Sequence, residues 1–257
     1  MGVYYRDDGI VLRTQDLGEA DRIITVLTRR TGRVRAVGKG VRRTKSRFGA
    51  RLEPFTHVDL LLYAGRSNLD TVTQADSLRA YGEPLAADYP RYTSGVAMLE
   101  TAERFTPEEK QPAQRQFLLL VGGLRALGEG AHAPRLVLDA FLLRSLAVAG
   151  YAPALDECAV CGSPDVLGVK GDGEAGRGSR VFAIPAGGLT CRACRPAGAV
   201  TPSAHTIALM GALLRGDWAQ ADSSQRRHQV ECSGLVAAYL QWHLEHSIRS
   251  LRHVEHV

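Results

Sequence analysis

Four of the five cysteines in this 257-residue sequence form two C-x-x-C pairs. The first pair is Cys158 and Cys161, and the second pair, after a spacer of 29 residues, is Cys191 and Cys194. Each pair can sit on a tight turn that points both sulfurs at one centre, and four thiolates complete the tetrahedral coordination of zinc. Because such a closed set leaves no position for water or substrate, the sequence predicts one structural zinc ion.

Two other interpretations of these cysteines stay open: they form disulfides or remain free thiols, or one pair carries out redox chemistry. Disulfides are typical of secreted chains, but Asp7 and Asp8 interrupt the apolar core that a signal peptide would need at the start of the sequence. Redox chemistry by one C-x-x-C motif would require a βαβ context that this segment lacks. The fifth cysteine, Cys232, lies among apolar residues at helical spacing and is predicted to be a buried thiol.

A block of basic residues gives the chain its positive charge. The stretch from Arg29 to Arg51 holds ten Lys or Arg and no Asp or Glu, within a chain of 32 basic and 27 acidic residues. Without the block, 22 basic residues would face 27 acidic ones, so the net charge of +5 depends on this stretch. Positive charges that are clustered in one segment repel one another unless a polyanion neutralises them. This favours a surface that binds nucleic acid over a solvated basic face without a partner.

The elements that must position the block are short strands. Five runs rich in Val, Ile, Leu and Thr occur in the first eighty residues, at 10–14, 23–28, 34–37, 58–63 and 69–75. Five strands without long helices between them predict an OB-fold barrel, whose sheet face and loops commonly bind nucleic acid. Because side chains alternate along a strand, Arg33 and Arg35 are expected on the outer face of the third strand, followed by a mobile polycationic loop from Lys39 to Arg47.

Eight basic residues are candidate phosphate contacts. They share a position on the third strand or in the segment after it: Arg33, Arg35, Lys39, Arg42, Arg43, Lys45, Arg47 and Arg51. Phosphate contacts carry no sequence information, so DNA binding is predicted to be largely sequence-neutral. Since Phe48 is the only aromatic residue in the block, charge is predicted to dominate over base stacking.

From about residue 85 the hydrophobic spacing becomes helical. Helices are predicted over 85–102, over 106–130 with Thr106 as N-cap, over 134–149 with Gly150 after it, over 201–215 with Thr201 as N-cap, and over 224–252. The fold class is therefore α+β, an OB-fold barrel followed by an all-α helical domain with an inserted four-cysteine zinc segment. The predicted domains are 1–80 for the barrel, 81–152 and 200–257 for the helical domain, and 153–199 for the zinc segment.

No catalytic motif is found. Gly171, Gly173 and Gly176 match G-x-G-x-x-G, but a turn and a strand follow them instead of a helix, so Lys170 to Arg180 is predicted to be a loop. No Ser-His-Asp set or pair of catalytic carboxylates stands out, so the chain is predicted not to be an enzyme. Apolar runs fall far short of the roughly 18 residues that cross a bilayer, which predicts no membrane partner and a cytoplasmic protein.

Six short motifs occur in a fixed order along the chain. They are Gly18–Arg22 (GEADR), Thr28–Arg33 (TRRTGR), Lys39–Arg43 (KGVRR) with Ser46 and Arg47, Leu52–Phe55 (LEPF), Leu155–Gly162 (LDECAVCG), and Gly187–Leu189 before Cys191. This ordered set resembles the bacterial RecO family of recombination mediators, from the first strand to the final helix. Family members vary in whether they keep the four cysteines, and this chain keeps all four.

The resemblance implies an OB-fold domain, a helical domain and a zinc-binding segment. It also implies a mediator of DNA repair and homologous recombination that binds single- and double-stranded DNA, anneals complementary strands and helps load RecA on DNA coated with single-strand binding protein. The implied partners are RecR, the C-terminal tail of single-strand binding protein and, indirectly, RecA, on the nucleoid. Two rival functions are a zinc-dependent nuclease or modifying enzyme, which the closed cysteine set disfavours, and a zinc-ribbon factor that acts on RNA or a polymerase.

Overall fold

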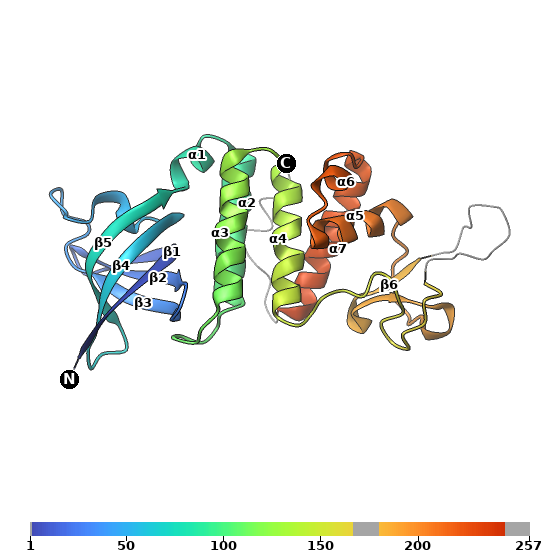
Figure 1. Cartoon of the computed structure of the whole chain (residues 1–257), viewed down its shortest axis with the longest axis horizontal. Helices are drawn as coiled ribbons and strands as arrows, with labels where there is room; N and C mark the ends of the chain where they lie inside the picture. The colour runs from blue at the N-terminus through green and yellow to red at the C-terminus, as the bar shows by residue number, and fades with distance from the viewer. Residues whose placement is uncertain (1, 167–179, 245–257) are drawn as a thin grey trace. The chain divides into compact units, whose positions relative to one another are not determined.

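The computed structural model describes residues 2–166 and 180–244, which form two compact units, 2–134 and 135–244 (Figure 1). The predicted glycine-rich loop, except for Arg180, and the predicted end of the last helix beyond residue 244 lie outside the described residues. Within the described ranges, no helix combines the length and the apolar character that crossing a bilayer requires. The domain boundaries at residues 80, 152 and 199 stay a prediction.

The first unit contains a five-stranded barrel, in agreement with the predicted OB fold. Its strands are β1 Val3–Leu17, β2 Asp21–Thr28, β3 Gly32–Gly38, β4 Thr56–Ala64 and β5 Asp70–Ala80. They pair in the order β1-β2-β3-β5-β4, and β4 also pairs with the first half of β1. The β3–β5 pair is parallel and short, whereas the other four pairs are antiparallel.

Alternating residue types separate the inside of the barrel from its outside. In β3, Val34 and Ala36 are fully buried, whereas Arg33 and Arg35 lie on the outer face. Val41, Phe48 and Leu52 from the segment after β3 pack into the interior of the barrel. The rest of the interior is filled by aliphatic side chains from all five strands: Val11, Ile24, Val26, Val34, Ala36, Val58, Leu60, Leu62, Val72 and Ala75. The basic segment is therefore anchored by apolar residues at its start and at its end.

Helices α1 Gly82–Ala86, α2 Tyr89–Arg104 and α3 Gln114–Glu129 complete the first unit. The single helix predicted over 85–102 is two helices, because Asp88 caps α2 by accepting the N–H of Arg91, with Pro90 in the first turn. The helix predicted to start at Thr106 begins instead at Gln114. The Thr106 hydroxyl donates back to the Ala102 carbonyl of α2, and the residues that follow lie along β3.

The second unit is built from helices and a small hairpin. Its elements are α4 Pro134–Val148, β6 Val181–Ala183, β7 Gly188–Thr190, α5 Ala204–Arg215, α6 Trp218–Asp222 and α7 Arg226–His243, with 3-10 turns η2 Ile184–Ala186 and η3 Arg192–Cys194. The N-cap of α5 is Ser203, not the predicted Thr201, because the Ser203 hydroxyl accepts the N–H of Thr206. The strand predicted after the glycine-rich loop is β6, whereas β7 and α6 were not predicted.

Side chains join the helices of the second unit. The Arg144 guanidinium of α4 donates to the Leu213 carbonyl of α5 at 3.0 Å. The Ser233 hydroxyl of α7 donates to the buried Asp139 carboxylate of α4 at 2.6 Å. Burial raises the pKa of Asp139 to about 7, although the hydrogen bond from Ser233 acts to lower this pKa. Cys232, beside Ser233 on α7, is fully buried, which confirms the prediction for this thiol.

Candidate metal centre and nucleic-acid interface

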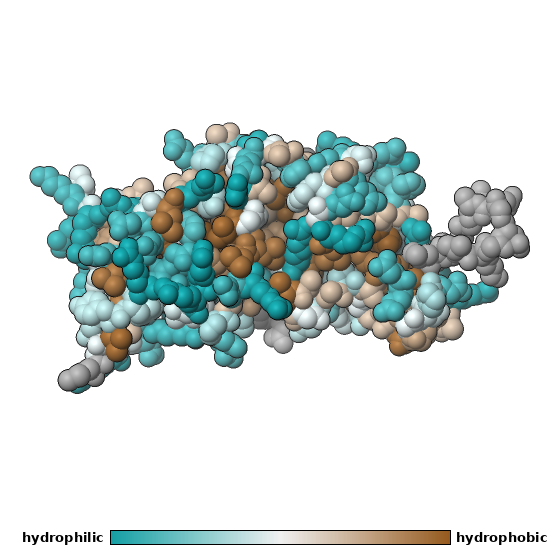
Figure 2. Space-filling view, in the orientation of Figure 1, coloured by the Kyte–Doolittle hydropathy of each residue, from teal (hydrophilic) through white to brown (hydrophobic). Residues whose placement is uncertain are grey.

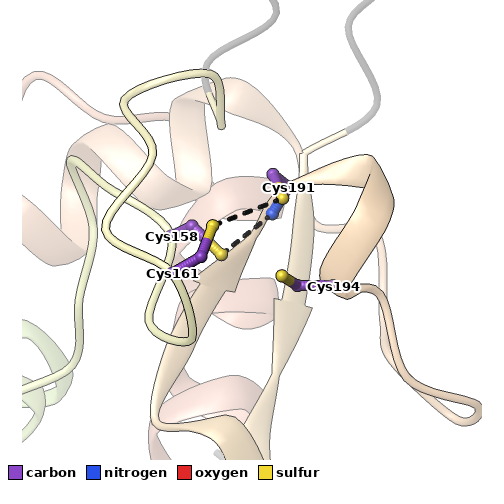
Figure 3. Close-up of side chains that lie close together, drawn as sticks. All are labelled: Cys158, Cys161, Cys191 and Cys194. Carbon is purple, nitrogen blue, oxygen red and sulfur yellow. Dashed lines mark hydrogen bonds between the residues drawn. The ribbon is translucent and has the colours of Figure 1, made fainter.

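The four predicted ligand cysteines come together in the second unit (Figure 3). Cys158 and Cys161 lie on a turn between α4 and β6, and Cys191 and Cys194 lie at η3 after β7. All four sulfurs lie within 4.8 Å of one another, and Cys161 Sγ is 3.8 Å from Cys191 Sγ. Four sulfurs bound tetrahedrally at about 2.3 Å from zinc are separated by about 3.8 Å. The cysteines therefore can hold one metal ion.

Backbone geometry places the two cysteine pairs side by side. Gly162 and Gly187 have φ angles of 70° and 88°, which L residues rarely adopt. The Gly162 N–H donates to the Cys158 carbonyl at 2.8 Å and closes the first turn. The Ala159 N–H donates to the Leu189 carbonyl at 2.8 Å and joins that turn to β7. The hairpin thus presents the second pair of sulfurs to the first.

Hydrogen bonds and neighbouring thiols shift the pKa values of the cysteines in this cluster. The Cys191 N–H donates to Cys158 Sγ at 3.4 Å and, with the N–H groups of Cys161 and Val160, lowers the pKa of Cys158 to about 6 despite burial. The neighbouring thiols of Cys191 and Cys161 raise the pKa of Cys194 to about 12. Because four thiols this close cannot all ionise unaided, a metal ion is what would hold them as thiolates.

The segment from Lys39 to Arg51, here called the basic loop, is exposed on the barrel. Hydrophilic residues dominate much of the barrel surface that faces the viewer in Figure 2. Every cation of the basic loop is exposed: Lys39, Arg42, Arg43, Lys45, Arg47 and Arg51. Within the part of the chain that the structure describes, Arg42 is paired with a carboxylate, whereas the other five, Lys39, Arg43, Lys45, Arg47 and Arg51, have no carboxylate partner. These five charges are open to an external anion.

The turn between β1 and β2 fixes the start of the basic loop. The Gly40 N–H donates to the Asp21 carboxylate at 2.8 Å, and the Arg42 N–H donates to the Ala20 carbonyl at 3.0 Å. The Arg42 guanidinium also lies 3.4 Å from the Asp16 carboxylate. With its apolar anchors in the core, the loop holds its cations on a defined surface.

Arg33 lies on the outer face of β3, as predicted, but a second segment covers it. This segment, Thr106–Gln111, is called the strap. The Lys110 N–H donates to the Arg33 carbonyl at 2.8 Å, and the Arg33 guanidinium donates to the carbonyls of Thr106, at 2.6 Å, and Pro107. The side chain of Arg33 is only 12% exposed. The Arg33 guanidinium therefore donates its hydrogen bonds largely to the strap.

Arg35 and the rest of the strap show the same arrangement. The Arg35 guanidinium lies 3.6 Å from the Glu109 carboxylate, with the Arg35 side chain 35% exposed. Lys110 extends to the fully buried Asp70 at 2.8 Å, which also accepts the Tyr5 hydroxyl at 2.5 Å. The strap was not predicted, because Thr106 and the proline after it match the start of a helix.

A buried carboxylate shapes the turn between β2 and β3, where the basic block begins. Asp7 is 1% exposed and accepts the N–H and the hydroxyl of Thr31, both at 2.9 Å, and the N–H of Arg30 at 3.2 Å. Burial alone would raise the pKa of Asp7, but these donors bring it below its usual value. Asp7 therefore stays ionised and holds the turn.

Family models cover nearly the whole chain. One described as "Recombination protein O N terminal" matches residues 1–81, and one described as "Recombination protein O C terminal" matches residues 86–252. The chain belongs to the RecO family. Three similar proteins are each named DNA repair protein RecO, and the similarity covers 98% of both chains in each case. The RecO protein of Thermobifida fusca (strain YX) is 70% identical over 251 residues, that of Streptomyces griseus 59% over 257, and that of Frankia casuarinae 59% over 251.

The two matched regions contain the two features of this chain. The N-terminal family model coincides with the barrel that carries the basic loop, and the C-terminal model includes the four cysteines. The resemblance found in the motifs is confirmed along the whole sequence.

Proposed function

We propose that this RecO family member is a mediator of DNA repair and homologous recombination that binds single- and double-stranded DNA through its barrel. The observation that carries the proposal is the basic loop, with six exposed cations on a segment anchored in the barrel core. Lys and Arg at a surface displace the counterions of a phosphate chain, which supplies most of the affinity for non-specific DNA. The similar proteins named for DNA repair support the same assignment.

The proposed phosphate contacts follow the placement of the side chains. Lys39, Arg42, Arg43, Lys45 and Arg47 would be the main contacts, and Arg51 would extend their track. Arg33 and Arg35, which the strap holds, would add positive potential beneath the track. Two complementary strands repel each other, so a surface that neutralises phosphates on both lowers the barrier to annealing. No covalent chemistry is needed, and the proposed role is not enzymatic.

One structural zinc ion at Cys158, Cys161, Cys191 and Cys194 is part of the proposal. The spacing of the sulfurs supports zinc, because it matches tetrahedral coordination by four thiolates and leaves no open position for substrate. Elemental analysis of the purified protein is expected to give one zinc per chain, and Cys158→Ser is expected to lose it. Protein that contains no metal and is fully stable would end this part of the proposal.

The proposed place of action is DNA coated with single-strand binding protein, on the nucleoid of the cytoplasm. There the chain would anneal strands and help load RecA, with RecR and the C-terminal tail of single-strand binding protein as partners. Family membership supports these roles. RecA would be affected only indirectly.

The proposal is tested by the annealing of two complementary DNA strands. The native protein should accelerate annealing, and a variant with Arg42, Arg43 and Lys45 changed to Glu should not, since reversed charges repel both strands. A control variant, Arg104→Glu with Arg115→Glu, removes exposed cations of α2 and α3 and should anneal like the native protein. No acceleration by the native protein, or equal acceleration by the Glu variant of the loop, would refute the proposal.

A further inference from the structure

The outer surface of the barrel carries a pair of tyrosines outside the basic loop, one exposed and one partly exposed. Tyr4 of β1 and Tyr63 of β4 are direct partners in the strand register. Their ring centroids lie 4.9 Å apart with the planes tilted by 51°, which is a favourable aromatic contact. Tyr4 is nevertheless 62% exposed. Its ring is thus fixed in direction without being covered.

Tyr63 acts as the brace of this pair. A Cβ atom on Gly2 would lie 2.2 Å from the Tyr63 hydroxyl oxygen, so the backbone at Gly2 packs closely against that ring. Tyr63 therefore has Gly2 on one side and Tyr4 on another, and it is only partly exposed. A tyrosine that is already oriented loses little conformational entropy when a flat ligand binds to it.

The tyrosine pair and the basic loop share one surface of the barrel. In the strand register Tyr4 pairs with Tyr63, Tyr63 with Thr71, and Thr71 with Val37, two residues before Lys39. This row faces outward, because its neighbours along the strands point into the core and are fully buried: Leu62, Val72 and Ala36. Three strand spacings amount to about 14 Å, which is within the reach of a strand that occupies an OB fold.

The charged residues near the row of Tyr4, Tyr63, Thr71 and Val37 are compatible with a bound phosphate chain. Arg66, in the exposed turn between β4 and β5, follows Tyr63 by three residues. Asp70, after the same turn, is fully buried and accepts hydrogen bonds from Tyr5 and Lys110, so it presents no free carboxylate. The row itself contains no charged residue. A strand bound at the basic loop could therefore continue across Thr71 to the tyrosines without crossing a repulsive group.

We propose that Tyr4, braced by Tyr63, stacks on an unpaired base of a single strand whose phosphates lie along the basic loop. The inference rests on the proposed function and adds to it a contact with the bases. Stacking tolerates every base, since each has a flat π face, and it requires a base that is not paired. Tyr4 thereby favours single-stranded over double-stranded DNA, while the basic loop attracts both.

The test compares Tyr4→Ala with Tyr4→Phe in the full chain. Fluorescence anisotropy would measure binding to a labelled thymidine strand, to the same strand made abasic, and to a duplex. Tyr4→Ala should weaken binding to the thymidine strand about 5- to 150-fold, the loss of one stacked base. Tyr4→Phe, which keeps the ring, should bind like the native protein. The abasic strand and the duplex should bind equally well to all three proteins.

The salt dependence separates this inference from the proposed function. Because stacking releases no counterions, Tyr4→Ala should keep the native slope of log affinity against log salt, whereas loss of basic-loop cations changes the slope. A Tyr4→Ala protein with native affinity for the thymidine strand, or with equal losses on the abasic strand, refutes base stacking and leaves the basic loop standing. Thermal unfolding of the variants controls for folding. If Tyr4→Ala is unstable, equal affinities of the native protein and a folded Tyr4→Ser refute the inference instead.

Discussion

Neutralising two cations of the basic loop gives a prediction whose size follows from the structure. Arg43 and Lys45 are both exposed and have no carboxylate partner among the described residues, so Gln at both positions removes phosphate contacts without breaking an ion pair. If about five phosphates are neutralised on a single strand, log affinity should fall against log salt with a slope near −3.5. Removal of two contacts should bring the slope to about −2.1.

These slopes translate into measurable affinities. Between 50 and 200 mM salt, the native protein should lose about 130-fold in affinity for a single strand, and the Arg43→Gln, Lys45→Gln variant only about 18-fold. Anisotropy titrations with a labelled oligonucleotide at four or five salt concentrations measure both slopes. The matched control changes Arg104 and Arg115 to Gln, which removes the same charge from α2 and α3. A loop variant with the native slope, or a control with the same reduced slope, would refute the assignment of the loop as the phosphate track.

Four further outcomes are expected. Cys161→Ser should abolish stoichiometric zinc in elemental analysis, whereas Cys232→Ser should leave it unchanged, because Cys232 is a buried thiol outside the four-cysteine cluster. The raised pKa of Asp139, about 7, means that the free energy of unfolding should fall as the pH rises from about 4 to 7, and Asp139→Asn should remove that fall in thermal unfolding. Asp7, whose pKa is lowered, should behave oppositely: its stabilisation is present at neutral pH and is lost on acidification, and Asp7→Asn should cost about 1–3 kcal/mol in urea unfolding at pH 7. Arg33→Gln should destabilise the barrel unit and leave the salt slope nearly unchanged, because carbonyl groups of the strap accept the hydrogen bonds of the Arg33 guanidinium.

Each of these outcomes has a contrary result that would show the reasoning to be wrong. Zinc retained by Cys161→Ser would exclude that thiol as a ligand. An unchanged pH profile in Asp139→Asn, or native stability of Asp7→Asn at pH 7, would mean that the buried carboxylate is not the titrating group. A slope reduced by about 0.7 in Arg33→Gln, with native stability, would show that the strap releases this cation to DNA.

The barrel could be predicted from the sequence because its signal is local. Alternation in β3 puts Val34 and Ala36 inside and Arg33 and Arg35 outside, and the observed burial agrees with it. The cysteine cluster could be predicted for a related reason, since two C-x-x-C turns need only one hairpin to bring the four sulfurs together.

The strap could not be predicted, because its conformation depends on contacts with β3 that are distant in sequence. Thr106 and Pro107 carry a helix-start signal, but the Arg33 guanidinium takes the carbonyls of both residues, and Lys110 pairs with β3. Strand pairing across more than seventy positions thus overrides a local capping preference. The break between α1 and α2 was missed for the opposite reason, because a continuous apolar pattern masked the local cap at Asp88.

The most direct test of the account is the annealing of complementary strands that are coated with single-strand binding protein. The native protein should anneal the coated strands, while the variant with Glu at Arg42, Arg43 and Lys45 should leave them separate although it folds and retains zinc. Failure of the native protein to anneal coated strands, or equal annealing by the Glu variant, would contradict the claim that the basic loop brings the two strands together.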